Sequence, residues 1–315
     1  MKQPRVCVMG VVSALLALFN PFILPAWSQN QATGVHLINE VKHDTSPSLR
    51  EMMATATPPK SATPPHVIPV HPTRTMPATA AAPVADPALQ HTGLPFVAAT
   101  LGLNFEGVGN GQYGFTPNAA PPDTNGAVGA TQYVQWVNES FAVFDKNTGA
   151  LLAGPTTGNT LWSGFGGGCQ TNNDGDPIAQ YDKIANRWVM TQFSVSTTPF
   201  LQCVAVSTTS DATGTYNRYA FSFGSNFPDY PKLGVWPDAY YMSFNMFNAS
   251  GTAFLGAQAC ALNRAKMLAG QAATMICKPS PLSSGIDSLL PSDMDGTIQP
   301  TSGEPAFFID FTTNA

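Results

Sequence analysis

Short runs of aromatic and aliphatic residues, separated by turn residues, recur along the C-terminal two thirds of the chain. Three of them, each beginning with an aromatic residue 10 to 12 positions after an aspartate, span residues 133–137, 188–193 and 240–244. A further run follows each of these, at residues 141–144, 201–206 and 254–262. Because such runs bounded by Gly, Pro, Asn and Asp are typical of β-strands, the pattern predicts an all-β fold.

The aspartates that precede these runs have a fixed period. Asp123, Asp176 and Asp229 are each 53 residues apart, and each lies among Pro, Gly or Asn in a turn-forming setting. The second copy contains four predicted strands, at residues 178–181, 188–193, 200–206 and 218–223. A period of this length with four short strands is typical of one blade of a β-propeller. A β-sandwich with similar strands would leave the recurring Asp turn unexplained.

A fourth copy begins near the end of the sequence. Its turn is Asp293-Met294-Asp295-Gly296, and a strand-like run follows at residues 307–311 before the sequence ends at Ala315. Closure protects the strand edges of a propeller, so three blades and the start of a fourth would leave an edge open. We therefore expect residues 98–315 to be a β-propeller-like domain that is truncated at its C-terminus.

The N-terminal third has a different character. Residues 1–28 carry two basic residues, an apolar run of about 14 residues and a small-x-small site at Ala26-Trp27-Ser28, which predicts a cleaved secretory signal peptide. A membrane-spanning helix would need roughly 20 apolar residues. Residues 29–56 form a short mixed segment that could include a turn or two of amphipathic helix. Residues 57–97 are rich in Pro, Ala and Thr, which predicts an extended, disordered linker.

The composition and charge of the chain argue against a nucleic-acid partner. Charged residues make up 10% of the chain, and 14 Lys and Arg against 19 Asp and Glu leave a formal net charge of −5. A nucleic-acid-binding protein would carry a basic surface. We expect no nucleic-acid partner and, after signal cleavage, no membrane span.

Four cysteines remain once the signal is removed: Cys169, Cys203, Cys260 and Cys277. An even number in an exported chain predicts two disulfide bonds. Three pairings are possible, and the favoured one joins Cys169 to Cys203 and Cys260 to Cys277, because each bond would then link one local unit. No C-x-x-C spacing supports a zinc site.

One turn concentrates oxygen ligands. Asn173, Asp174 and Asp176 lie around Gly175, and calcium takes this kind of ligand set. The same residue types are common in turns, where their side chains accept hydrogen bonds from nearby backbone N–H groups. Calcium at these three residues is therefore one hypothesis, and a purely structural turn is the other.

Candidates for ligand binding and catalysis are few. Trp162, beside the glycine-rich residues 164–168, could stack on a sugar ring or pack beside a flexible loop. The predicted propeller has no histidine beyond His91 at its edge and no Gly-x-Ser-x-Gly, which argues against a serine hydrolase. A glycosidase needs only two facing carboxylates, and the acidic candidates are Glu106, Glu139, Asp145, Asp182, Asp238 and Glu304.

Four segments, at residues 121–129, 158–165, 173–177 and 229–238, carry a resemblance to other proteins. They resemble segments of a group of large, secreted, uncharacterised bacterial proteins. The resemblance spans the chain from about residue 101 onward and implies export and a propeller-like body, without a particular activity.

A more distant similarity lies in Gly175-Asp176-Pro177-Ile178 and Asp229-Tyr230-Pro231, which are similar to blade starts of the sialidase-like propeller superfamily. The Asp-box of that superfamily is Ser-x-Asp-x-Gly-x-Thr-Trp. Its nearest counterpart here is residues 209–216, with one extra residue between Asp211 and Gly214. Three clustered arginines would bind the substrate carboxylate of a sialidase. The arginines here, Arg187, Arg218 and Arg264, do not fall at blade starts, which argues against sialidase activity.

These observations favour a secreted, non-catalytic propeller module that binds a protein or a polysaccharide outside the cytoplasm. One alternative is a secreted glycan-active hydrolase or lyase, whose carboxylates would face each other about 5 to 10 Å apart in a central pocket. The other is a calcium-stabilised structural domain of a larger surface protein.

Overall fold

The fold is mostly β, as the spacing of hydrophobic runs predicts. A computed structural model of the chain describes residues 34–55, 66–67, 102–117 and 119–310. The predicted signal peptide and nearly all of the predicted linker lie outside these residues. No helix in the described part is long and apolar enough to cross a membrane.

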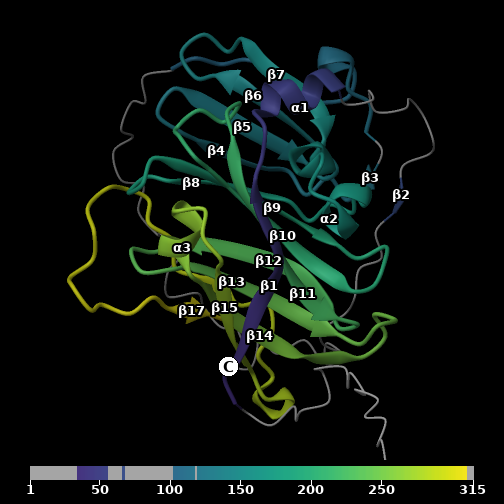
Figure 1. Cartoon of the computed structure of the whole chain (residues 1–315), viewed down its shortest axis with the longest axis vertical. Helices are drawn as coiled ribbons and strands as arrows, with labels where there is room; N and C mark the ends of the chain where they lie inside the picture. The colour runs from purple at the N-terminus through teal and green to yellow at the C-terminus, as the bar shows by residue number, and fades with distance from the viewer. Residues whose placement is uncertain (1–33, 56–65, 68–101, 118, 311–315) are drawn as a thin grey trace, which may run out of the picture. The chain divides into compact units, whose positions relative to one another are not determined.

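Three antiparallel four-stranded units follow one another along the chain (Figure 1). The first contains β4 (Asn125–Val128), β5 (Gln132–Val137), β6 (Ser140–Asp145) and β7 (Leu151–Thr157). The second contains β8 (Ile178–Asp182), β9 (Arg187–Ser194), β10 (Phe200–Ser207) and β11 (Tyr216–Gly224). The third contains β12 (Phe227–Val235), β13 (Tyr240–Phe247), β14 (Phe254–Leu262) and β15 (Thr274–Pro279). All four strands predicted for the second copy are confirmed.

The second and third units are joined into one nine-stranded sheet by β1 (His36–Thr45). β1 pairs with β11 on one side and with β15 on the other, with His43 opposite Tyr219 and Leu37 opposite Ile276. The composition of the chain predicts that the folded domain starts near residue 98. That boundary is too late, because an N-terminal strand fills the gap between two units that come more than a hundred residues after it.

The helix after β1 also belongs to this fold. α1 (Leu49–Thr55) begins with reciprocal bonds, in which the Ser48 backbone N–H donates to Glu51 Oε2 at 2.9 Å and the Glu51 N–H donates to Ser48 Oγ at 3.3 Å. This capping box satisfies N–H groups that a helix start leaves unpaired. Leu49 is fully buried in the core between the first and second units.

The core lies between the faces of successive units. One cluster joins Val134, Trp136 and Val143 of the first unit to Trp188 and Met190 of the second. Another joins the opposite face of the second unit to the third. At the inner edge, β4 contacts β8 and β8 contacts β12. At the outer edge, β11 and β15 are held apart by β1, so the units diverge from a shared inner edge.

The other short elements connect these units. The described helical turns are η1 (Gln112–Gly114), η2 (Gly158–Trp162), α2 (Gly167–Thr171), α3 (Arg264–Leu268) and η3 (Leu282–Ser284). The remaining strands form two-stranded ladders, a parallel one between β2 (His66–Val67) and β3 (Ala119–Ala120) and an antiparallel one between β16 (Leu290–Pro291) and β17 (Phe308–Ile309).

Both predicted disulfide bonds are present. Cys169 is bonded to Cys203, and Cys260 is bonded to Cys277. The first bond ties α2 to β10, and the second joins residues that are opposite each other on β14 and β15. Two disulfides are more typical of proteins in an oxidising, extracytoplasmic compartment than of cytosolic ones.

The region of the predicted fourth copy packs against the third unit. Asp293 Oδ1 accepts a hydrogen bond of 2.8 Å from the Val235 N–H, and the ring of Phe308 lies edge-on to that of Tyr241, with centroids 5.8 Å apart. The Ser292 carbonyl oxygen lies 2.2 Å from the position that a Cβ would occupy at Gly234, so only glycine allows this close approach. Within the described residues, this region forms the two-stranded ladder of β16 and β17 and not a complete four-stranded unit.

Candidate functional site

The three aspartates of the 53-residue repeat are brought together. Asp123 and Asp176 precede the first strands of the first and second units, and Asp229 lies in the first strand of the third. The charges of Asp123 and Asp229 both act on Asp176, so residues far apart in sequence share one site at the inner edge of the units. We call Asp123, Asp176, Asp229, Tyr230 and Lys232 the aspartate site.

The backbone at this site is unusual. Asp123 has a φ of 40°, Asp176 of 44° and Tyr230 of 53°. Left-handed backbone is uncommon outside glycine, although Asp and Asn adopt it more readily than most residues. Asp123 and Asp176 are therefore suited to these turns, whereas in the third copy the left-handed residue is Tyr230, next to Asp229.

Burial and neighbouring charges raise the pKa values of the carboxyl groups of Asp123 and Asp176. The pKa of Asp176 is raised to about 7, mainly by burial and further by the charges of Asp229 and Asp123. Burial also raises the pKa of Asp123, with a smaller contribution from Asp229. A carboxyl group with a pKa near 7 exchanges its proton at neutral pH, which is the property that general acid–base catalysis requires.

Lys232 supplies the positive charge of the site. Its Nζ lies 3.4 Å from the centroid of the Tyr230 ring and donates to the Pro231 carbonyl at 3.3 Å. Burial lowers the pKa of Lys232, whereas Asp176, Asp123 and Asp229 raise it. The side chain of Tyr230 is 44% exposed, so one part of the site is an accessible aromatic ring beside a cation.

The turn between β5 and β6 adjoins the aspartate site. Asn138 Nδ2 donates to Asp123 Oδ2 at 2.8 Å and to the Pro121 carbonyl at 2.7 Å. The next residue, Glu139, has a pKa raised to about 7, mainly by burial and further by the charge of Asp174. A second carboxyl group that exchanges its proton near neutral pH therefore lies in the adjoining turn.

The predicted calcium ligands are used in hydrogen bonds. Asn173 Oδ1 accepts from the Asn159 N–H at 3.0 Å, and its Nδ2 donates to the Glu139 carbonyl at 3.0 Å. Asp174 Oδ2 accepts from the backbone N–H groups of residues 195 and 196. Asp176 belongs to the aspartate site. In the described part of the chain, no group of three or more His, Cys, Asp or Glu side chains is arranged to hold a metal ion.

Trp162 lies in the core between the first and second units. Its side chain is 0% exposed, and it packs in the cluster that contains Trp136 and Trp188. A sugar ring needs an accessible aromatic face, so Trp162 offers no stacking surface in this structure. The glycine-rich residues that follow it form part of α2 and its N-terminal turn.

Two of the other acidic candidates have structural roles. Asp182 is fully buried, where it pairs with Arg264 at 2.7 Å and accepts a hydrogen bond of 2.9 Å from the Tyr240 hydroxyl. Asp145 accepts from the N–H groups of residues 147 and 148 in the turn after β6. Asp211, in the sequence that is most similar to an Asp-box, accepts from the Thr213 N–H and from Gln132 Nε2 in the turn between β10 and β11.

The 53-residue period of the sequence identifies the three aspartates but not Tyr230 and Lys232, which complete the site. Tyr230 and Lys232 are one and three residues after Asp229, so their closeness to this one aspartate is evident in the sequence. Their closeness to Asp123 and Asp176 is not, because it depends on how the three units pack. No family model, no curated protein and no solved structure matches the chain.

Proposed function

We propose that this chain is a secreted, non-catalytic propeller module that binds a polysaccharide through the aspartate site. Three successive four-stranded units whose first strands contact one another support the propeller architecture. The two disulfides and the predicted signal peptide support export.

The chemistry of the site supports a sugar ligand. Ionised carboxylates accept hydrogen bonds from hydroxyl groups, and an exposed tyrosine ring offers an apolar face with a polar tip. The aspartate site combines both, with Tyr230 exposed beside Asp229 and Lys232. The single observation that carries the proposal is that the charges of the three repeat aspartates act on Lys232, whose Nζ lies against the accessible ring of Tyr230.

Polysaccharide binding is tested with a panel of soluble and insoluble polysaccharides and purified Tyr230 variants. We expect Tyr230→Ala to weaken binding about tenfold, which is the effect of losing about 1.4 kcal/mol. Tyr230→Phe keeps the ring and should bind like the wild type. Tyr113→Ala is the matched control, because Tyr113 is 41% exposed and lies outside the aspartate site. Equal binding by the wild type and Tyr230→Ala would contradict the proposal.

A second function, hydrolysis or elimination of a glycan, is favoured by one observation. Asp176, with a pKa of about 7, holds its proton over the pH range in which an ordinary carboxyl group has lost it, and it lies beside other carboxyl groups. Pairs of carboxyl groups with separated pKa values are how glycosidases divide the acid and base roles. Release of reducing ends or unsaturated products by the wild type, lost in Asp176→Asn with binding retained, would establish the enzyme.

A further inference from the structure

Successive units of this chain pack face against face, and two faces at the ends of the series have no unit against them within the described residues. The first unit buries one face against the second, and the third unit buries one face against the second from the other side. The outer face of the first unit is covered in part by residues 102–117, and that of the third in part by residues 289–309.

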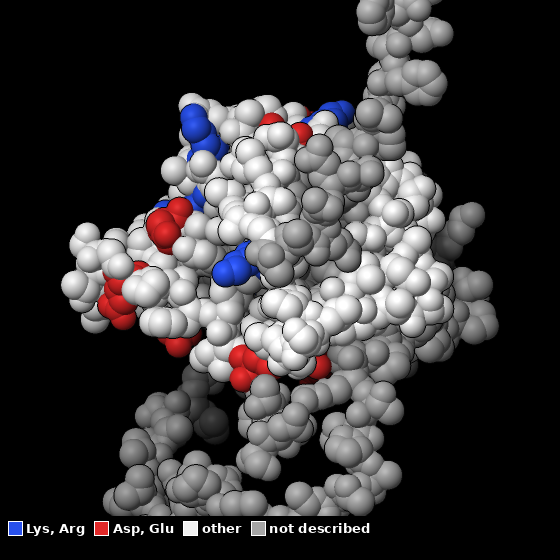
Figure 2. Space-filling view, turned by 90° about the horizontal axis from the view of Figure 1, so that it is seen from below, with Lys and Arg blue, Asp and Glu red and all other residues white. Residues whose placement is uncertain are grey.

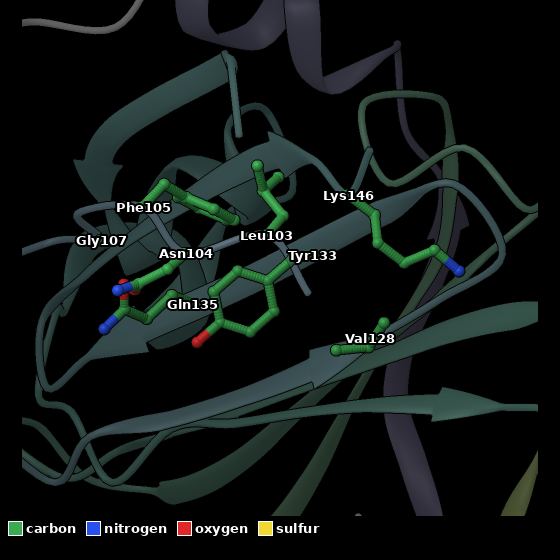
Figure 3. Close-up of a pocket in the computed structure, with 8 residues that line it drawn as sticks. All are labelled: Leu103, Asn104, Phe105, Gly107, Val128, Tyr133, Gln135 and Lys146. Atoms are coloured by element: carbon green, nitrogen blue, oxygen red, sulfur yellow. The ribbon is translucent and has the colours of Figure 1, made fainter. Parts of the chain in front are cut away.

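The covering of the first unit leaves a groove. Its volume is about 410 Å³, and it is lined mainly by Leu103, Phe105, Val128, Tyr133, Gln135 and Lys146. Figure 3 shows Phe105, Gln135 and Tyr133 gathered at one end and Lys146 at the other. Leu103 and Val128 are both more than half exposed. The groove therefore presents apolar side chains and one cation to the solvent.

The covering of the third unit leaves an exposed apolar ladder, formed by Leu290, Phe307 and Ile309. Leu290 of β16 is directly opposite Ile309 of β17, and the Ser292 N–H extends the pairing by donating to the Phe307 carbonyl at 2.8 Å. These three side chains are 51%, 55% and 66% exposed, whereas Phe308 between them packs on Tyr241. Apolar residues in register on a two-stranded ladder form a contiguous patch, which is typical of an interaction surface.

Charge distinguishes the two surfaces. Residues 279–310, which contain the ladder, include five Asp and Glu and no Lys or Arg. The charged residue that lines the groove is Lys146. Figure 2, which views the molecule from below, shows that most of the described surface on this side carries no charge and that acidic residues form separate small patches. The segment that contains the ladder is therefore acidic, whereas the charged residue that lines the groove is basic.

We propose that the apolar ladder of one copy of this chain binds the groove of a second copy. The groove lies on the face that a preceding unit would cover, and the ladder lies on the face that a following unit would cover. Face-to-face contact of this kind already joins the units within the chain. A contact between two different surfaces is head-to-tail, and it closes a dimer when the rotation between the copies brings the second ladder onto the first groove.

The test is self-association of the purified full chain, measured by sedimentation velocity from low to high micromolar concentration. We expect the wild type to dimerise and Ile309→Asp, in the ladder, to sediment as a monomer. Val128→Asp, in the groove, should do the same. Ile298→Asp is the matched control, because Ile298 is 92% exposed in the same acidic segment but lies outside the ladder, and this variant should dimerise like the wild type.

Mixing the two monomeric variants distinguishes a head-to-tail contact from other modes. The Ile309→Asp chain keeps an intact groove and the Val128→Asp chain keeps an intact ladder, so the mixture should recover a one-to-one complex. A wild-type protein that is monomeric at all concentrations would overturn the proposal. So would a Val128→Asp variant that still dimerises alone, because the ladder would then pair with itself.

Discussion

Replacement of Asp176 by Asn should stabilise the protein, and the gain should depend on pH. Asn cannot ionise, it has nearly the shape of a protonated Asp, and it tolerates the φ of 44° at this position. Folding raises the pKa of Asp176 from its ordinary 3.8 to about 7, mainly through burial. The wild-type protein therefore holds a proton between these values that the unfolded chain has already lost.

The sign and size follow from this difference. Between about pH 4 and about pH 7, unfolding releases a proton, so the contribution of Asp176 to the free energy of unfolding falls as the pH rises. A rise in pKa from 3.8 to about 7 corresponds to about 4 kcal/mol, at about 1.4 kcal/mol for each pH unit. The free energy of unfolding of Asp176→Asn should equal that of the wild type at about pH 4. The difference in favour of the variant should grow steadily up to about pH 7 and remain constant above it.

Urea denaturation followed by tryptophan fluorescence is a suitable assay, because Trp136, Trp162 and Trp188 are all fully buried. The control is Asp145→Asn, since backbone N–H bonds from residues 147 and 148 lower the pKa of Asp145. That variant should lose stability relative to the wild type above the ordinary carboxyl pKa, which is the opposite sign. An Asp176→Asn variant with the same stability difference at about pH 4 and about pH 8 would refute the reasoning.

Three further substitutions test the packing that positions the site. Asp182→Ala should lower the free energy of unfolding by about 3–5 kcal/mol, because it leaves Arg264 buried without its partner, whereas Asp238→Ala at an exposed position should change it little. Leu49→Ala should cost about 2–5 kcal/mol if α1 belongs to the fold, and Leu37→Ala, at a position that is 58% exposed on β1, should cost much less. Replacing Cys169 and Cys203 together by Ser should cost about 3–4 kcal/mol, because the bond closes a loop across a separation of 34 residues. Each is measured by denaturant unfolding, and an unchanged midpoint for Leu49→Ala would show that residues 49–55 do not pack as described.

Much of the local structure was predictable. The strands of the second unit follow from alternating and aromatic-rich runs between turn residues, and their observed bounds differ from the predicted ones by two residues at most. The disulfide pairing agrees with the shortest separations along the chain, 34 and 17 residues. Cys260 and Cys277 are opposite each other on β14 and β15, whereas Cys169 reaches Cys203 on β10 from α2. The capping box at Ser48 and Glu51 was also present in the sequence as a local signal.

Other features depend on contacts between residues that are far apart in the sequence. The sequence of β1 does not specify β11 and β15 as its partners, because strands pair through backbone N–H and C=O groups that nearly every residue has. The residues next to Trp162 in the sequence do not determine whether its side chain is exposed or buried. The packing of the first unit on the second buries it in the core between them.

The sequence by itself determined the strands, their 53-residue period and the residue types at each turn, because those depend on local backbone preference and on the alternation of apolar side chains. The tertiary structure decided which turns meet. The pKa values of Asp123 and Asp176 are raised, and both carboxyl groups share Lys232 with Asp229, only because the first strands of three units contact one another. Burial and Coulomb interaction depend on distance in space and not on separation along the chain.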